Sequence, residues 1–181
     1  MKEFIQKHKL FSFYTALMLV IVFIAIFAPW IAPGDAFTSD MSKALQAPSA
    51  QHWFGTDKLG RDVLSRIIYG TQLSLFMGVS IVVIMVSIGT VIGAVAGYFG
   101  GKVEMVLMRL ADIMLSFPGV VLAIAIAGIL GGSIVNTILA LSVVGWAKYA
   151  RLVRSMTLKV RGEEYVTAAV MMGASTWTIL R

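Results

Sequence analysis

The chain alternates between long apolar runs and shorter polar segments, a pattern typical of a protein that crosses a membrane several times. The first run, residues 10–28, contains no charged residue. As a helix rising about 1.5 Å per residue it would span roughly one hydrocarbon core. Further apolar runs cover 73–100, about 113–131 and about 134–150. The pattern predicts four spanning helices, and therefore an all-α membrane protein built as a polytopic transmembrane helix bundle.

A cleaved signal peptide is the alternative explanation of the first run. Its apolar region would be shorter, and small residues at a cleavage site would follow it. Pro29, Trp30 and Ile31 follow instead. We therefore expect a retained transmembrane helix over residues 10–28.

The polar segment 29–72 contains a short amphipathic stretch just before the second run. Thr56 or Asp57 is a suitable helix N-cap residue, and apolar side chains follow from Val63. Two carboxylate–arginine pairs stand four residues apart: Asp57 with Arg61, and Asp62 with Arg66. The pattern predicts a short interfacial helix. An elbow that sets how the second span enters the membrane is favoured over a gate or receptor contact, but both remain open.

Composition agrees with the membrane interpretation. The chain is 59% hydrophobic and 13% charged, whereas soluble domains carry about 25% charged residues. It contains no cysteine, and its two histidines, His8 and His52, are far apart. We therefore expect no metal site, and no nucleophile–base pair for catalysis. No phosphate-binding G-x-x-x-x-G-K-[ST] motif is present either, so the chain is not expected to be an enzyme that hydrolyses ATP.

The distribution of positive charge predicts the orientation. Eleven of the fifteen lysines and arginines lie in residues 1–9, between the second and third runs, or at the end of the fourth run and after it. Because cytoplasmic loops carry an excess of positive charge, we expect the N-terminus, 1–9, and the closing segment, 161–181, in the cytoplasm. The 29–72 loop is then extracytoplasmic. The net charge of +6 reflects this asymmetry and is not taken as a sign of nucleic-acid binding.

Several residues within the runs suit packing or movement. The glycines of the second run, Gly78, Gly89, Gly93 and Gly97, include a G-x-x-x-G pair that favours close helix contact in lipid. Arg109 and Asp112, three residues apart, are expected to form an ion pair that anchors the third span, with a role in gating as the alternative. Pro118 is a candidate hinge, although a proline is also tolerated in a membrane helix without movement.

The closing segment 161–181 is amphipathic. Glu163 and Glu164 suit the first turn of a helix, and Gly173 suits the left-handed turn that ends one short helix and starts another. An apolar stripe on a cytoplasmic helix must be covered. The pattern alone leaves open whether a partner protein or the lipid headgroups cover it.

The stretch "EEYVTAAVMMGAS" resembles the cytoplasmic motif of ATP-binding-cassette (ABC) importer permeases, in which E-A-A is followed by three residues and a glycine. Ala168, Ala169 and Gly173 match the motif, whereas Thr167 stands where the motif has glutamate. Three further stretches, "HWFGTDKLGRDVLSRIIYGTQLSL", "MRLADIMLSFPGVVLAI" and "WAKYARLVRS", are similar to dipeptide, oligopeptide and nickel permeases. The resemblance covers about residues 50–181 and is to the second permease of a pair.

This resemblance implies a type I ABC importer permease fold in the bacterial inner membrane. The partners it implies are a second permease subunit, two ATPase subunits or domains that bind ATP and Mg, and an extracytoplasmic solute-binding protein. No cofactor is expected in this chain. Seven residues are expected to form the ATPase-coupling surface: Glu163, Glu164, Tyr165, Ala168, Ala169, Gly173 and Ala174. Further helices are expected after Arg181, so the chain is interpreted as C-terminally truncated.

The resemblance leaves the substrate open between peptides and nickel or other metal chelates. A channel or secondary carrier that works without an ATPase is the alternative function, and a membrane anchor for a soluble complex is a third. A carrier would be expected to place ionisable groups deep in its spans. The first two apolar runs contain none.

Overall fold

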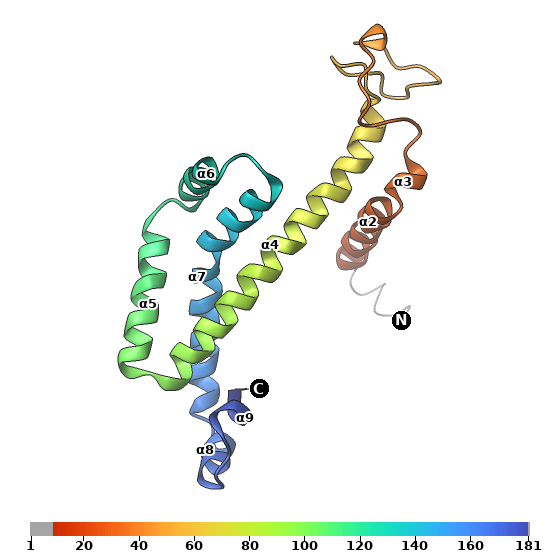
Figure 1. The fold of residues 1–181 in the computed structure, drawn as a ribbon. Helices are drawn as coiled ribbons and strands as arrows, with labels where there is room; N and C mark the ends of the chain where they lie inside the picture. The colour runs from red at the N-terminus through yellow and green to blue at the C-terminus, as the bar shows by residue number, and fades with distance from the viewer. Residues whose placement is uncertain (1–8, 181) are drawn as a thin grey trace. The chain divides into compact units, whose positions relative to one another are not determined.

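A computed structural model describes residues 9–180, and within them the chain folds into helices joined by loops, with one isolated β-bridge (Figure 1). The all-α class is therefore confirmed. The predicted cytoplasmic N-terminus lies almost wholly outside the described residues, as does Arg181. The chain divides into two compact units, which meet after Gly78 within one long helix and are described separately below.

The first unit begins with α2, Lys9–Ile26, and the short α3, Ala28–Ile31. Pro29 lies in the first turn of α3, where its missing N–H leaves no hydrogen bond unmade. The side chains of α2 are mostly exposed, with Leu19 at 63% and Phe23 at 55%. A helix of this length and composition is able to cross a membrane, in agreement with the predicted first span.

The loop between α3 and α4 is held together by specific turns and contains one short 3₁₀ helix, Met41–Lys43. Thr56 and Asp62 form the isolated bridge, and the Thr56 Oγ1 accepts a 2.8 Å hydrogen bond from the Gln46 N–H. Gly60 adopts a φ of +73°, and a Cβ there would stand 1.8 Å from the Asp40 carbonyl oxygen. The loop backbone is therefore closely packed against Asp40 at this point, with no room for a side chain.

Asp62 is the residue that starts α4. Its Oδ2 accepts hydrogen bonds of 2.7 Å from both the N–H and the Oγ–H of Ser65, and its Oδ1 lies 3.0 Å from His52 Nδ1. The Asp62 side chain is almost fully buried. Burial raises the pKa of Asp62, but hydrogen bonds from Ser65 and His52 outweigh it and leave the pKa below its ordinary value.

Two sequence predictions for this loop are therefore wrong. Neither Thr56 nor Asp57 caps the helix, because Asp62 does. The predicted Asp62–Arg66 pair is absent among the described residues, because Arg66 Nη1 instead lies 2.9 Å from Asp57 Oδ2. The predicted Asp57–Arg61 pair is confirmed at 2.8 Å. Arg66 pairs with the carboxylate nine residues away, because the Asp62 carboxylate is buried and already bonded to Ser65 and His52.

Helix α4, Val63–Phe99, is continuous over 37 residues. At about 1.5 Å per residue it is about 55 Å long, well beyond a hydrocarbon core of about 30 Å. The predicted interfacial helix is therefore not a separate element but the first turns of α4. Helix α4 is also apolar enough to cross a membrane, as predicted for residues 73–100.

The second unit contains the rest of α4, followed by α5, Gly101–Ser116, α6, Gly119–Leu130, and α7, Ile134–Arg161. Helices α5 and α6 both pack on α7 (Figure 1). Trp146 of α7 is buried together with Ala111 of α5, with Met108 and Met114 against them. Small side chains beside one large aromatic group let these helices approach closely.

Three glycines of α4 lie against α7. A Cβ at Gly89 would stand 2.5 Å from Tyr149 Cβ, and one at Gly93 would stand 2.4 Å from the Ala150 carbonyl oxygen. Gly97 is similarly close to α7, whereas a Cβ at Gly78 would meet nothing within 4 Å. The prediction of close packing is thus confirmed for Gly89, Gly93 and Gly97, but not for Gly78.

The predicted third span, 113–131, is wrong as one continuous helix. Helix α5 ends at Ser116, α6 starts at Gly119, and the two meet at 90°. Pro118 explains the break: it has no N–H to donate, and Phe117 before it takes the extended backbone that a following proline favours. The pair counts as a span only if both helices are taken together.

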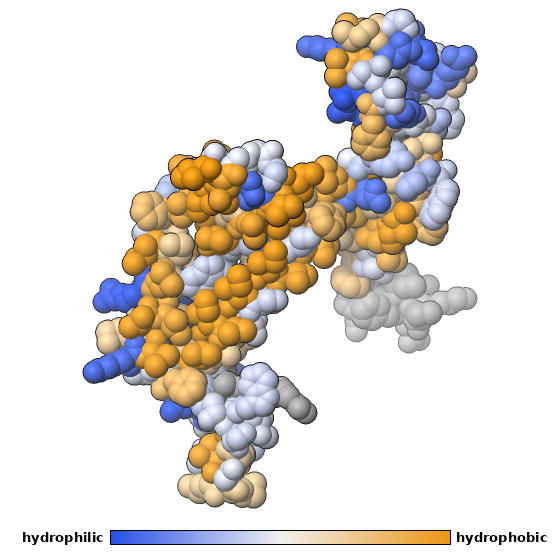
Figure 2. Space-filling model, viewed as in Figure 1, coloured by the Kyte–Doolittle hydropathy of each residue, from blue (hydrophilic) through white to orange (hydrophobic). Residues whose placement is uncertain are grey.

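The predicted fourth span corresponds to α7, which continues beyond the predicted end at residue 150. It contains Lys148, Arg151 and Arg154, and is not among the helices long and apolar enough to cross a membrane alone. Figure 2 shows apolar side chains covering the visible surface of α4 and α6. Val83 and Val91 of α4, for example, are 57% and 63% exposed. Such a surface suits lipid or other membrane helices rather than water.

Candidate functional site

The segment after α7 forms two short helices, α8, Glu164–Met171, and α9, Thr176–Leu180. Only Gly162 and Glu163 separate α7 from α8. Their N–H groups donate to the carbonyl oxygens of Lys159 and Val160, at 3.2 and 3.0 Å. Two residues with both N–H groups bonded leave little freedom at the joint between α7 and α8.

The end of α8 gives a physical reason for the spacing of Ala169 and Gly173. The Ala174 N–H donates to the Ala169 carbonyl oxygen, and the Gly173 N–H donates to the Val170 carbonyl oxygen, both at 3.0 Å. This is the Schellman arrangement, which needs a left-handed residue four positions after its first carbonyl. Gly173 has a φ of +85°. The predicted left-handed turn at Gly173 is therefore confirmed.

Ser175 starts α9 and was not among the predicted site residues. Its Oγ accepts a 3.3 Å hydrogen bond from the Thr178 N–H and lies 2.8 Å from the Thr178 hydroxyl. A serine just before a helix, whose side chain accepts from the third residue, is an N-cap. This rule applied to Ser175 could have found it from the sequence. The turn between α8 and α9 is thus fixed from both sides.

The surface of α8 and α9 is largely uncovered and apolar. Met171 is 83% exposed, Met172 82%, and Trp177 74%. Val166 alone is buried in α8. The seven predicted coupling residues all lie on this segment: Glu163, Glu164, Tyr165, Ala168 and Gly173 are exposed, and Ala169 and Ala174 are half-buried. Glu164 lies in the first turn of α8, where a negative charge favours the helix dipole.

A hollow of about 380 Å³ lies beside α8, where Tyr98 and Phe99 of α4 face Val166 and Val170. Arg161, the last residue of α7, places its guanidinium 6.0 Å from the centre of the Tyr98 ring. This is within the range of a cation–π contact. The ends of α4, α7 and the start of α8 therefore meet at one place.

Two ion pairs join α5 to α7 in the same unit. Arg154 Nε lies 2.6 Å from Glu104 Oε1, and Arg151 pairs with Asp112. The predicted Arg109–Asp112 pair is therefore wrong: Arg109 is exposed and belongs to none of the ion pairs found within residues 9–180. The partners are 50 and 39 residues apart in the chain, so no local spacing rule could have identified them.

The predicted hinge and gate residues are not part of the α8–α9 segment. Pro118 is the residue before α6, and Asp112 lies on α5. Within residues 9–180, no three His, Asp or Glu side chains come together as a possible metal site. The α8–α9 segment offers an exposed, apolar contact surface.

Comparison with known proteins supports the resemblance. Residues 89–181 match the family described as binding-protein-dependent transport system inner membrane component, which is more than half of the chain. Residues 5–48 match a second family, the N-terminal transmembrane domain of oligopeptide transport permease C. The second match ends in the loop before α4, and the first begins within α4.

Three relatives illustrate the similarity. A probable D,D-dipeptide transport system permease protein of Escherichia coli is 42% identical over 91% of this chain and 55% of its own length. A dipeptide transport system permease protein of Alkalihalophilus pseudofirmus is 41% identical over 97% of this chain and 58% of its own. A glutathione transport system permease protein of Escherichia coli is 42% identical over 99% and 59%.

The chain thus spans a little over half the length of these curated relatives. They are transport permease proteins and not enzymes, and the long apolar helices of this chain agree with a multi-pass membrane protein. The chain belongs to the family of binding-protein-dependent transport system inner membrane components, within its dipeptide and oligopeptide permease branch.

Proposed function

We propose that this chain is the membrane part of an ATP-driven importer of peptides, and that its α8–α9 segment receives the movement of an ATPase subunit. The observation that supports this most directly is the geometry of α8. The helix is short, exposed and apolar, it ends on the left-handed Gly173, and it joins α7 through two residues. A protruding element with a fixed joint suits a lever.

The lever would act through α7. Helix α7 packs against α5, α6 and the glycines of α4, so a push on α8 would move these helices as a group. No described residue forms a nucleotide-binding loop, so the energy would come from two ATPase subunits or domains that bind ATP and Mg. A second permease subunit would complete the translocation pathway, and an extracytoplasmic binding protein would deliver the substrate.

Peptides are the proposed substrate class because the relatives are named for dipeptide, D,D-dipeptide and glutathione transport. All three are short peptides or close analogues of one. Nickel and metal chelates, which the sequence left open, gain no support from these names. In the proposed topology the N-terminus and α8–α9 lie in the cytoplasm of a bacterium, and the segment 29–72 lies outside.

Two glycine substitutions test the proposal. In Gly173→Ala the backbone of the alanine must adopt a φ of +85°. This left-handed conformation costs about 1–2 kcal/mol and disturbs the end of α8. Gly162→Ala is the matched control, because Gly162 has a φ of −79° and a Cβ there meets nothing closer than 3.5 Å. Both changes are made in the full-length permease, assembled with its partners in proteoliposomes.

We expect Gly173→Ala to lower both ATPase association and ATP-dependent peptide uptake, and Gly162→Ala to leave both near the parent level. Equal behaviour of the two variants would count against a coupling role for α8. Uptake that persists in liposomes without any ATPase would instead support a channel or secondary carrier.

A further inference from the structure

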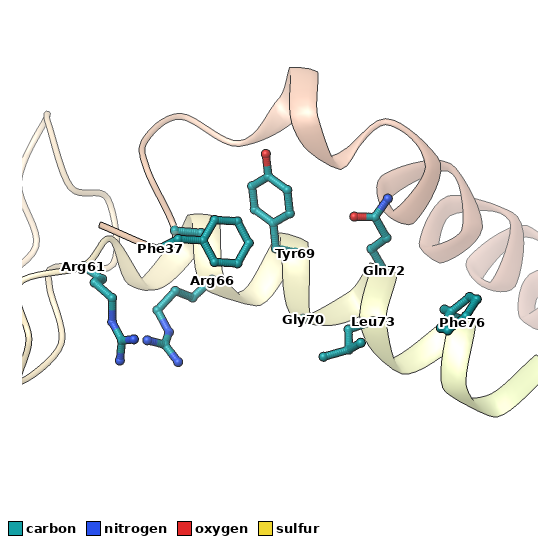
Figure 3. Close-up of a pocket in the computed structure, with 9 residues that line it drawn as sticks. Phe37, Arg61, Arg66, Tyr69, Gly70, Gln72, Leu73 and Phe76 are labelled. Carbon is teal, nitrogen blue, oxygen red and sulfur yellow. The ribbon is translucent and has the colours of Figure 1, made fainter. Parts of the chain in front are cut away.

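The start of α4 carries a hollow of about 550 Å³ that the proposed coupling does not use. Figure 3 shows the guanidinium groups of Arg61 and Arg66 side by side at one end, and Leu73 and Phe76 further along the helix. The aromatic rings of Phe37 and Tyr69 pack edge to face between these ends, with centroids 5.0 Å apart. The hollow is therefore charged at one end and apolar at the other.

The charged end carries surplus positive charge. Both guanidinium groups bind the same atom, Asp57 Oδ2, with Arg61 Nη2 at 2.8 Å and Arg66 Nη1 at 2.9 Å. The other carboxylate oxygen of Asp57, Oδ1, accepts hydrogen bonds from the backbone N–H groups of Leu59 and Arg61. Two cations therefore share one carboxylate that has its hydrogen bonds filled, and several of their N–H donors are left for another anion.

Asp57 does not lose its charge under ordinary conditions. Burial raises the pKa of Asp57, but hydrogen bonds and the charge of Arg61 outweigh it and lower the pKa to about 2. The net charge of this three-residue cluster therefore stays at about +1 near neutral pH. Phosphate is a suitable ligand, because a guanidinium binds it through two parallel hydrogen bonds.

The position of the two ends of the hollow along α4 indicates which kind of ligand would fit it. Arg66 is the last charged residue before Lys102, so it marks where α4 leaves the polar region. Phe76 lies ten residues further along, about 15 Å deeper. Leu73 and Phe76 are 43% and 62% exposed, with their side chains available to an apolar chain. A ligand that fills the hollow must be anionic at one end and hydrocarbon at the other.

We propose that this hollow binds an anionic phospholipid, with its phosphate at Arg61 and Arg66 and an acyl chain against Leu73 and Phe76. An apolar helix of a second permease subunit would cover Leu73 and Phe76, but it would leave the surplus positive charge of the two guanidinium groups unmatched. The site shares no residue with the α8–α9 segment, so its failure would leave the coupling proposal intact.

Charge is tested with Arg66→Gln, which leaves the Asp57–Arg61 pair in place. Lys58→Gln is the matched control, since Lys58 is an exposed cation of the same loop that does not line the hollow. Shape is tested independently of charge with Gly70→Trp, because Gly70 lines the hollow and a Cβ there meets nothing within 4 Å. Gly78→Trp is its control, being equally open but outside the hollow.

The full-length permease, assembled with its partners, is placed in nanodiscs of phosphatidylcholine with increasing phosphatidylglycerol, and bound lipid is counted by native mass spectrometry. We expect phosphatidylglycerol to bind about fivefold less tightly in Arg66→Gln, as for the loss of one membrane-surface cation. Gly70→Trp should also bind less, and both controls should match the parent.

Three results would overturn the proposal. The first is equal retention of phosphatidylcholine and phosphatidylglycerol by the parent. The second is displacement of the lipid by millimolar inorganic phosphate, which would mark a site for a soluble anion. The third is full phosphatidylglycerol binding in Gly70→Trp, or a cross-link from position 70 to the second permease subunit in place of lipid.

Discussion

The contact between α4 and α7 gives the sharpest prediction about how movement is carried through this protein. Gly93 of α4 makes the closest approach to the backbone of α7: a Cβ there would stand 2.4 Å from the Ala150 carbonyl oxygen and 2.8 Å from Val153 Cβ. The first of these atoms is backbone, so no side-chain rotation relieves the clash. Reaching an ordinary contact distance would require the helices to separate by about 1 Å.

We expect Gly93→Ala to destabilise the helix pair by about 1–3 kcal/mol, the usual range for an overpacked contact. Gly78→Ala is the control on the same helix, because a Cβ there meets nothing within 4 Å. In a helix interior the change from glycine to alanine should be neutral or stabilising by up to about 1 kcal/mol.

The assay is thermal unfolding of both variants in the same detergent, followed by fluorescence-detected size exclusion. A second readout is the ratio of ATP hydrolysed to peptide transported in the assembled transporter. We expect Gly93→Ala alone to unfold at a lower temperature and to raise that ratio. Identical unfolding and coupling in the two variants would refute the reasoning from the close α4–α7 approach.

Three further predictions concern separate contacts. Glu104→Arg should cost about 0.5–1 kcal/mol, and the added change Arg154→Glu should restore much of it; a double variant no more stable than the single would refute the pair as a stabilising contact. Gly60→Ala should open the loop to protease, because its Cβ would stand 1.8 Å from the Asp40 carbonyl oxygen; unchanged digestion would contradict this. Asp57 has a folded pKa of about 2 against an ordinary value of 3.8, so its ionised form stabilises the loop above pH 3.8, and the effect fades as pH falls towards 2. Pepsin digestion of the loop should therefore rise within this window in the parent. Asp57→Asn should weaken that dependence, with the remainder due to the other loop carboxylates of lowered pKa, such as Asp62; an unchanged dependence in Asp57→Asn would contradict the role of Asp57.

Features determined by local chemistry were predictable from the sequence. The absence of charge over residues 10–28 and 73–100 was enough to place α2 and the centre of α4. The left-handed turn at Gly173 was predictable because few other residues adopt that conformation without strain. These inferences depend only on residues close together in the chain.

Features determined by competition between distant partners were not predictable. Arg66 has carboxylates available at both Asp57 and Asp62, and the fold of the loop decides between them. Asp112 likewise pairs with Arg151 of α7 and not with its neighbour Arg109. Spacing rules for helices assume that both partners lie on one helix, an assumption that fails when a loop or a second helix brings in a closer group.

The broken third span is an intermediate case. Pro118 was recognised as a helix-breaking residue, but the hydrophobic run around it favoured one continuous helix. The two resulting helices meet at 90°, because Phe117 takes an extended backbone before the proline. Whether Pro118 also moves during transport stays a prediction.

The central claim is that α8 and α9 contact an ATPase during transport, and the chain allows a direct measurement. Residues 1–181 contain no cysteine, so Met172→Cys, at a side chain that is 82% exposed, adds one labelling position to this stretch; the full-length permease without this change is the control. A photo-cross-linker attached there is activated in membranes of the full-length, assembled transporter during ATP turnover. The account predicts a cross-link to the ATPase subunit. Cross-links to phospholipid alone, or labelling of position 172 from the extracellular side of intact cells, would contradict it.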